Sequence, residues 1–147
     1  MLIVDDSVTM RAMLEQVIVA SSGYHVVGIA ADAATALTLM KKCRPDVVTL
    51  DIRMPGIDGL EFLHGINGKS HPPIVVVSSI SRAGTCETDV ALEAGAVACF
   101  DKATLLAEVP RFLRTLKKAA QPKKCATKLR FCHDQTDGYI QTVAPKV

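Results

Sequence analysis

Asp51 stands at the end of the mainly apolar run Val47–Leu50, and Asp5 and Asp6 follow the shorter apolar run Leu2–Val4. Apolar runs of this kind are typical of strands buried on both faces of a parallel sheet. Open α/β folds carry their chemistry just outside the carboxyl ends of such strands. The sequence therefore predicts that these three carboxylates meet at one edge of a sheet.

Two further strand ends add a hydroxyl group and an ammonium group. Ser78 follows the β-branched run Ile74–Val77, and Asp101 and Lys102 follow the run Ala96–Phe100. Clustered carboxylates repel one another, and a raised pKa or a nearby cation relieves the repulsion. Lys102 would offset negative charge on a bound phosphoryl group, and the hydroxyl of Ser78 would donate a hydrogen bond to it.

A set of oxygen ligands suits a hard cation. Mg²⁺ keeps several waters and takes one or two carboxylates together with phosphate oxygens. These residue types therefore predict carboxylate, Mg²⁺ and phosphoryl chemistry, with an aspartate as the candidate nucleophile. The structural alternative is that Asp51 caps its turn and that Asp5 and Asp6 cap the helix that follows them.

Five strands and five helices in strict alternation must position these groups. Strands are predicted at residues 2–4, 25–30, 46–50, 74–77 and 96–100. Helices are predicted between residues 7 and 21, between 32 and 45, from 58 to about 66, up to about 94 after a loop at 81–86, and from 109 to 120. This alternation predicts an α/β fold, with a doubly wound five-stranded parallel sheet between two layers of helices.

Residues with strong positional preferences mark the helix ends. Ser7, Asp32 and Asp58 suit N-caps, Gly95 suits a left-handed C-cap, and Pro110 suits the first helical position. Helical spacing predicts inward-facing stripes of Met10, Met13, Leu14, Val17 and Ile18; of Ala33, Ala36, Leu37 and Met40; of Leu60, Leu63 and Ile66; and of Phe112, Leu113 and Leu116.

Charge divides the chain into an acidic body and a basic end. Residues 1–110 hold 8 Lys and Arg against 13 Asp and Glu, whereas residues 111–147 hold 9 against 2. Hydrophobic periodicity stops near Gln121. We expect one domain over residues 1–120 and a basic, poorly ordered linker or tail over residues 121–147.

Cysteine usage and hydropathy bear on the compartment. The five cysteines are odd in number and form no Cys-x-x-Cys pair, which favours a reducing cytoplasm. Met1 leads directly into a strand without a basic segment, so no secretory signal is expected. No apolar run approaches the ~20 residues that a membrane span needs, so no membrane association is expected.

Taken in order, these motifs resemble the receiver domain of two-component response regulators, over roughly residues 1–120. The motifs are Ile3-Val4-Asp5-Asp6-Ser7, Asp51 with Met54-Pro55-Gly56 and Asp58-Gly59, Val77-Ser78-Ser79, and Asp101-Lys102. The resemblance implies a flavodoxin-like fold of five parallel strands and five helices. It also implies a cytoplasmic phosphoprotein that works with a sensor histidine kinase and with a downstream protein or output domain.

The resemblance assigns a role to each site residue. Asp51 would accept a phosphoryl group from the kinase's phosphohistidine, and Lys102 would contact the phosphoryl oxygens. Ser78 would be the switch hydroxyl that biases the face made by the fourth helix, fifth strand and fifth helix.

The resemblance also implies a magnesium site. Asp5 and Asp6 would hold Mg²⁺ together with Asp51, and the backbone carbonyl of Arg53 would be a further ligand. Only self-phosphotransfer and autodephosphorylation are expected of these residues, because no independent catalytic domain is recognised in the chain.

Two positions depart from the family pattern. The family usually has a proline after the lysine, and the peptide bond before that proline is often cis. Here Ala103 takes the place of the proline, so a cis bond would be costly and is not expected. Cys99 stands where the family often has Tyr or Phe as the aromatic partner of the switch. These departures affect the route from Asp51 to the outer surface rather than the phosphorylation itself.

Within the family, the motifs are most similar to chemotaxis regulators and to the receiver half of protein-glutamate methylesterases. The alternative to a stand-alone receiver is therefore the N-terminal regulatory part of a methylesterase. The catalytic domain would add roughly another domain length and a serine in a Gly-rich turn, and neither is present in these 147 residues.

Three other functions are weaker. A Mg²⁺-dependent phosphohydrolase would need a second aspartate two residues after the nucleophile, where this chain has Arg53. Cys125, Cys132 and His133 lack the spacing and the fourth ligand of a zinc site. The tail lysines are expected to be solvated, and no nucleic-acid-binding motif accompanies them.

Overall fold

The computed structural model describes residues 1–56, 58–79 and 85–121. Its strands are β1 (Leu2–Val4), β2 (Gly28–Ala30), β3 (Val48–Leu50), β4 (Ile74–Ser78) and β5 (Ala98–Asp101). Its helices are α1 (Val8–Val19), α2 (Ala33–Cys43), α3 (Gly59–Ile66), α4 (Thr85–Glu93) and α5 (Val109–Ala120). The predicted alternation of strands and helices is therefore confirmed.

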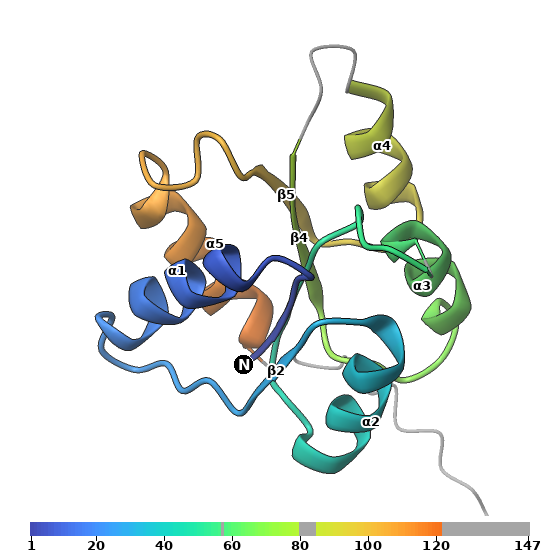
Figure 1. Ribbon diagram of the computed structural model, residues 1–147, viewed down its shortest axis with the longest axis horizontal. Coiled ribbons are helices and arrows are strands. Elements are labelled where there is room, and N and C mark those ends of the chain that lie inside the picture. The colour runs from blue at the N-terminus through green and yellow to red at the C-terminus, as the bar shows by residue number, and fades with distance from the viewer. Residues whose placement is uncertain (57, 80–84, 122–147) are drawn as a thin grey trace, which may run out of the picture.

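The five strands form one parallel sheet in the order β2-β1-β3-β4-β5. This order is that of flavodoxin-like folds, and the predicted fold class is confirmed. Helices α1 and α5 cover one face of the sheet, and α2, α3 and α4 cover the other (Figure 1). Both faces of the central strands are thus buried, as their continuous apolar runs require.

Several boundaries differ from the prediction, and β3 begins at Val48 rather than at residue 46 while β4 extends to Ser78. The strand expected at residues 25–30 is confined to Gly28–Ala30, because its neighbour β1 has only three residues to pair with. The last strand is Ala98–Asp101 rather than residues 96–100. Helix α4 begins at Thr85, inside the loop expected at residues 81–86, of which residues 81–84 lie outside the described part of the chain.

The predicted caps form. Ser7, Asp32 and Asp58 accept hydrogen bonds from the backbone amides of Met10, Thr35 and Leu60 at 3.4, 2.7 and 3.1 Å. Gly95 has a φ of +106°, a left-handed conformation that closes the α4 end without steric cost. Pro110 is the second residue of α5 rather than the first.

The core is mainly aliphatic, with Phe62, Phe100 and Phe112 added, and lies on both sides of the sheet. One layer packs Leu14 and Ile18 of α1 with Phe112 and Leu116 of α5, and the other packs α2, α3 and α4 against the opposite face. The prediction that Leu37 faces inward is wrong, because its side chain is 38% exposed. The buried stripe of α2 is narrow and consists of Ala33, Ala36 and Met40, and Leu37 lies on its flank.

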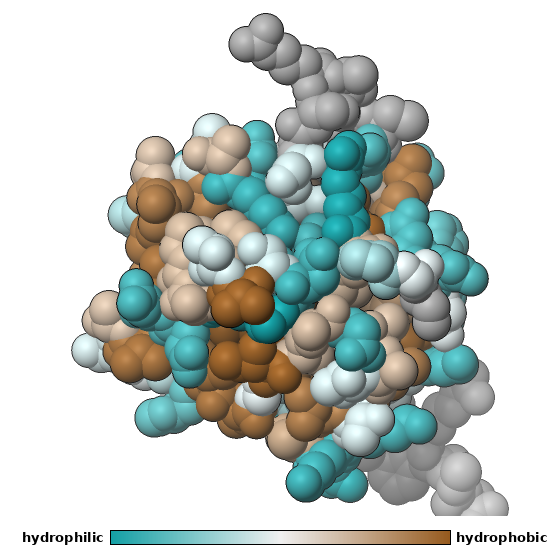
Figure 2. All heavy atoms as spheres, viewed as in Figure 1, coloured by the Kyte–Doolittle hydropathy of each residue, from teal (hydrophilic) through white to brown (hydrophobic). Residues whose placement is uncertain are grey.

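Apolar surface also remains at the outer edge of the sheet. Val27 and Ile29, next to and within edge strand β2, are 44% and 37% exposed. Figure 2 shows apolar side chains in the part of the view where Figure 1 draws β2 between α1 and α2. Among the described residues, none of the helices has the length and apolar character that crossing a bilayer requires.

The hydroxyl of Thr49 is an exception within the core. Thr49 is 1% exposed at the centre of β3, and its Oγ1 has no hydrogen-bond partner among the described residues. A buried polar group without a partner lowers the stability of the fold.

Thr49→Val is therefore expected to raise the free energy of unfolding by about 1 kcal/mol, because it replaces the unpartnered hydroxyl with a methyl group of similar size. Urea titration followed by circular dichroism measures the change. Thr49→Ser is the matched control: it keeps the hydroxyl, removes the methyl group and is expected to destabilise the fold. A valine variant less stable than the wild type would contradict this account.

Candidate functional site

Asp51 lies at the carboxyl edge of the sheet with a carboxylate that is only 2% exposed. Its Oδ1 accepts hydrogen bonds from the Ser78 hydroxyl at 3.0 Å and from the Arg53 amide at 2.9 Å. Its Oδ2 lies 2.6 Å from Lys102 Nζ. Both oxygens of this buried carboxylate are therefore held by donors from the end of β4, from the residue after β5 and from the loop after β3.

Lys102 joins the ends of two strands. Its Nζ lies 2.6 Å from Asp51 Oδ2 and 2.7 Å from Asp5 Oδ2. The Asp5 carboxylate is 1% exposed, and its Oδ1 accepts a hydrogen bond from the Ser7 amide at 2.9 Å. Within the described residues, Asp5 Oδ2 has no hydrogen-bond partner of good geometry, so its contact with the ammonium is an ion pair.

The two charges respond differently to burial. Burial raises the pKa of Asp5, and the Lys102 ammonium and the Ser7 amide offset this effect only in part. Burial opposes the charged form of Lys102 as well, but its pairing with Asp5 and Asp51 outweighs burial and raises the pKa of Lys102. One ammonium group thus faces two buried carboxyl groups, so acidic groups outnumber basic ones in the cluster.

The carboxylates fit a hard cation. Asp5, Asp6 and Asp51 each offer one oxygen, and these oxygens lie within 4.8 Å of one another. Asp6 is exposed and faces the solvent side of the cluster, whereas Asp5 and Asp51 are buried. The spacing of the three oxygens and the excess of acidic over basic groups both favour a cation there. Coordination by the Arg53 carbonyl stays a prediction.

Arg11 also contributes to the site, and its role was not predicted. Its guanidinium Nη1 donates to the carbonyl oxygens of Asp5 and Asp6 at 2.8 and 2.9 Å and fixes the loop that carries both carboxylates. A cation near the start of a helix opposes the helix dipole. This unfavourable position was the one signal in the sequence that Arg11 makes a contact outside its own helix.

Gly59 places helix α3 directly against the backbone behind the site. A Cβ atom at residue 59 would lie 2.5 Å from the Asp51 carbonyl oxygen and 2.4 Å from Ile52 Cα. The Gly59 amide also donates to the Ile52 carbonyl at 3.0 Å. Only glycine allows this approach, which accounts for the Asp58-Gly59 pair at the start of α3.

A second residue missed by the sequence argument is Glu87, on the first turn of α4. Its two carboxylate oxygens lie 2.8 and 3.0 Å from Arg53 Nη2. The contact joins residues 34 positions apart. No local pattern predicts it, because it depends on how α4 is placed against the loop after β3.

Cys99 on β5 pairs with Val76 of β4 and lines a cavity that Ser78 also lines. Val76, Ser78, Glu87 and Cys99 line a small cavity between β4, β5 and α4. The Cys99 thiol lies 3.8 Å from the Thr88 carbonyl, and burial raises its pKa to about 11. A neutral thiol thus occupies the position where the family pattern has an aromatic ring.

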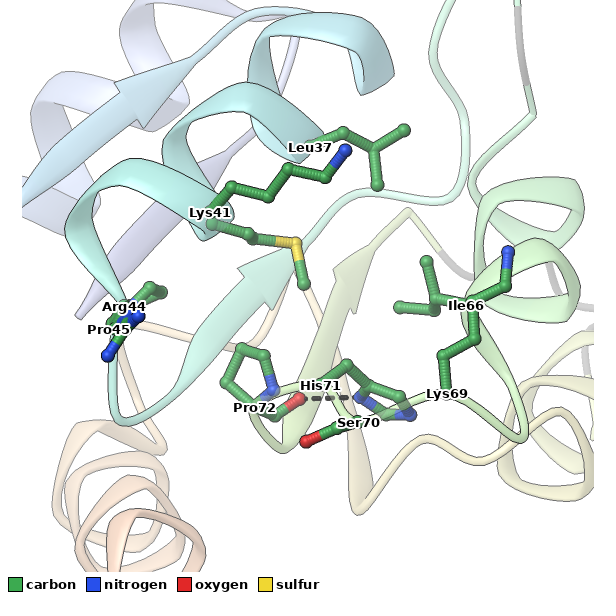
Figure 3. A pocket seen from close by; sticks show the side chains of 10 residues that line it. Leu37, Lys41, Arg44, Pro45, Ile66, Lys69, Ser70, His71 and Pro72 are labelled. Carbon is green, nitrogen blue, oxygen red and sulfur yellow. Dashed lines mark hydrogen bonds between the residues drawn. The ribbon is translucent and has the colours of Figure 1, made fainter.

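A wider cleft of about 680 Å³ lies at the opposite end of the sheet, between the C-terminal ends of α2 and α3 (Figure 3). Its rim carries Lys41, Arg44 and Lys69 above apolar side chains such as Leu37 and Ile66. Lys69 donates to the Gly65 carbonyl at 2.9 Å, so it serves the end of its own helix. No carboxylate is found among the described residues that line the cleft, so it is not the candidate site.

Comparison with known proteins agrees with this geometry. Residues 1–114 match the family model described as the response regulator receiver domain. Two curated relatives are protein-glutamate methylesterase/protein-glutamine glutaminases. That of Rhizobium johnstonii is 36% identical over 144 residues, which is 98% of this chain and 39% of the relative. That of Dechloromonas aromatica is 47% identical over 96 residues, 65% of this chain and 27% of the relative.

Solved structures show the same fold. The response regulator domain of Thermotoga maritima CheB has a TM-score of 0.74 and 34% identity, covering 82% of this chain and 95% of that one. The receiver domain of NtrX from Brucella abortus has a TM-score of 0.67 and 28% identity, covering 81% and 96%. The chain spans about two-fifths or less of the curated relatives' length. By fold and by sequence, it belongs to the response regulator receiver family.

Proposed function

We propose that Asp51 accepts a phosphoryl group from a sensor histidine kinase. The observation that carries this proposal is the set of donors on its carboxylate: the Ser78 hydroxyl, the Arg53 amide and the Lys102 ammonium. Capping a turn would not require the ammonium group of Lys102. That residue follows β5, which is separated from β3 by β4.

In the proposed transfer, one Asp51 oxygen forms a bond to phosphorus while the P–N bond of the donor phosphohistidine breaks. The donor imidazole leaves with the bonding electron pair and takes up a proton. Negative charge passes from the carboxylate to the phosphoryl oxygens. Lys102 Nζ, 2.6 Å from Asp51 Oδ2, is close enough to follow that charge and stabilise it.

We assign the cation to Mg²⁺, held by Asp5, Asp6 and Asp51 with the Arg53 carbonyl as a further ligand. When bound, it supplies the positive charge that the cluster lacks and neutralises phosphoryl oxygens. Asp5 is held by Ser7 and Lys102, and Arg11 holds the backbone of Asp5 and Asp6, so these ligands are positioned before the cation arrives.

The output of the proposed switch is a change in the α4–β5–α5 face. Ser78 donates to Asp51 at 3.0 Å and is the group that would follow a phosphoryl oxygen. The face would then contact a downstream protein or output domain. Cys43 and Cys99 are free thiols, which supports a reducing cytoplasm as the compartment.

A second candidate function is regulation of a methylesterase catalytic domain in chemotaxis-type signalling. The alignment with the Rhizobium johnstonii protein supports it, because the similarity runs through 98% of this chain and is not confined to the receiver motifs. The coding sequence downstream of Val147 tests this candidate: it should encode a catalytic serine in a Gly-rich turn, and a stop codon there would exclude it.

Acetyl phosphate with Mg²⁺ is expected to add one phosphoryl group to the wild-type protein, and Asp51→Asn is expected to abolish the addition, because an amide is not a nucleophile here. Intact-protein mass spectrometry measures the product, and acid or hydroxylamine lability identifies an acyl phosphate. Asp32→Asn, at an exposed helix cap, is the control and should be labelled normally. Labelling of the Asp51→Asn variant would exclude Asp51 as the acceptor.

Asp5→Asn is expected to raise the free energy of unfolding in the absence of Mg²⁺. The pKa of Asp5 is raised in the folded protein, so its ionised form costs stability at neutral pH. This cost is absent below the unfolded-state pKa of about 4 and is complete above the folded-state pKa. The advantage of the variant should therefore shrink as the pH falls through that window.

Adding Mg²⁺ should change the stability difference between the wild type and Asp5→Asn in the opposite direction, in favour of the wild type. At a hundredfold excess over its Kd, Mg²⁺ stabilises a protein by about 2.7 kcal/mol, and we expect this gain for the wild type but not for Asp5→Asn. Urea titrations with and without Mg²⁺ measure both effects, with Asp32→Asn as the control. An equal gain in Asp5→Asn would remove Asp5 from the cation site.

A further inference from the structure

The Arg53 side chain links the loop behind Asp51 to helix α4. Its Nη2 lies 2.8 and 3.0 Å from the two carboxylate oxygens of Glu87. The side chains of Arg53 and Glu87 are 48% and 38% exposed. Ion pairs with this degree of exposure contribute little to stability and exchange partners easily.

The same residue also touches the candidate acceptor. The Arg53 amide donates to Asp51 Oδ1 at 2.9 Å, so the backbone of Arg53 is fixed beside the carboxylate while its side chain points toward α4. A cavity of about 410 Å³ lies beside this pair, lined by Asp6, Arg53 and Glu87 among others. Arg53 therefore has open space on the side where Asp6 lies.

A phosphoryl group on Asp51 would give Arg53 a stronger partner than Glu87. It carries close to two negative charges and three acceptor oxygens. Guanidinium pairs with phosphoryl oxygens are short and often bidentate, whereas an exposed carboxylate pair is weak. The charge that appears at Asp51 thus competes directly with Glu87 for the same guanidinium.

We infer that the Arg53–Glu87 ion pair is a latch that holds α4 in the unphosphorylated protein and that opens when Arg53 turns to the phosphoryl group. The inference rests on the proposed phosphorylation of Asp51 and adds a route for the signal to reach α4. Cys99 carries no aromatic ring that could follow Ser78. Glu87 lines both the cavity beside Arg53 and the small one beside Ser78 and Cys99, so its release would be felt at both places.

Hydrogen–deuterium exchange of α4, read on peptides that cover residues 85–93, tests the latch, with beryllofluoride and Mg²⁺ as the phosphoryl mimic. In the wild type, the mimic should raise α4 exchange about two- to fivefold, the range expected for losing one exposed ion pair. In Glu87→Gln, exchange should already be raised by that factor without the mimic, and adding the mimic should change it little.

The charge-swapped variant, Arg53→Glu with Glu87→Arg, separates a latch from a merely structural contact. It should restore slow exchange in the resting protein, because the ion pair is re-formed with its charges reversed. It should not open with the mimic, because Glu at position 53 is repelled by the phosphoryl charge. Glu93→Gln, on the exposed last turn of α4, is the matched control and should behave as the wild type.

Two results would overturn the latch: unchanged α4 exchange in Glu87→Gln, or opening of the swapped variant by the mimic. Binding of the mimic is measured separately, from the stabilisation of each variant against urea. A wild type that binds the mimic without faster α4 exchange excludes the latch but keeps the phosphorylation site. A wild type that neither binds the mimic nor takes up a phosphoryl group excludes the site and the latch together.

Discussion

Repulsion between two buried carboxylates, Asp5 and Asp51, is the constraint on which this structure depends. Both are almost fully buried, and one ammonium, that of Lys102, lies within 2.7 Å of each. Lys102 follows β5, whereas Asp5 and Asp51 follow β1 and β3, so its side chain must pass the end of β4. The strand order therefore determines that the Lys102 ammonium lies beside both carboxylates, and another order would leave them without this cation.

Those contacts leave the resting site short of positive charge. The pKa of Asp5 is raised although an ammonium touches it, which shows that burial outweighs pairing at this position. Binding sites commonly carry such a cost, because a ligand of the opposite charge then recovers it. The receiver family to which the chain belongs and the cluster of three aspartates are consistent with a site of this kind.

Much of the fold could be predicted from the sequence because its signals are local. Strand ends placed Asp5, Asp51, Ser78 and Lys102 at one edge, and the caps at Ser7, Asp32 and Asp58 follow from side chains that compete with the backbone. The structure brings together the four residues named first, as predicted, while their chemical roles stay predictions.

The remaining features could not be predicted because they depend on tertiary placement. The length of β2 is set by the three residues of its partner β1, and the exposure of Leu37 by the width of the α2 stripe. Glu87 meets Arg53 only because α4 is oriented toward the loop after β3. Arg11 was marked only by its unfavourable position near the start of α1.

The contact at Gly59 makes the two sides of the site mechanically unequal. The start of α3 lies close against the backbone of Asp51 and Ile52 and is joined to it by a main-chain hydrogen bond, so moving α3 away would break that bond. On the other side, α4 meets the same loop through solvent-exposed side chains. We therefore expect a displacement that starts at Asp51 to move α4 rather than α3, because a backbone contact holds α3 and an exposed ion pair holds α4.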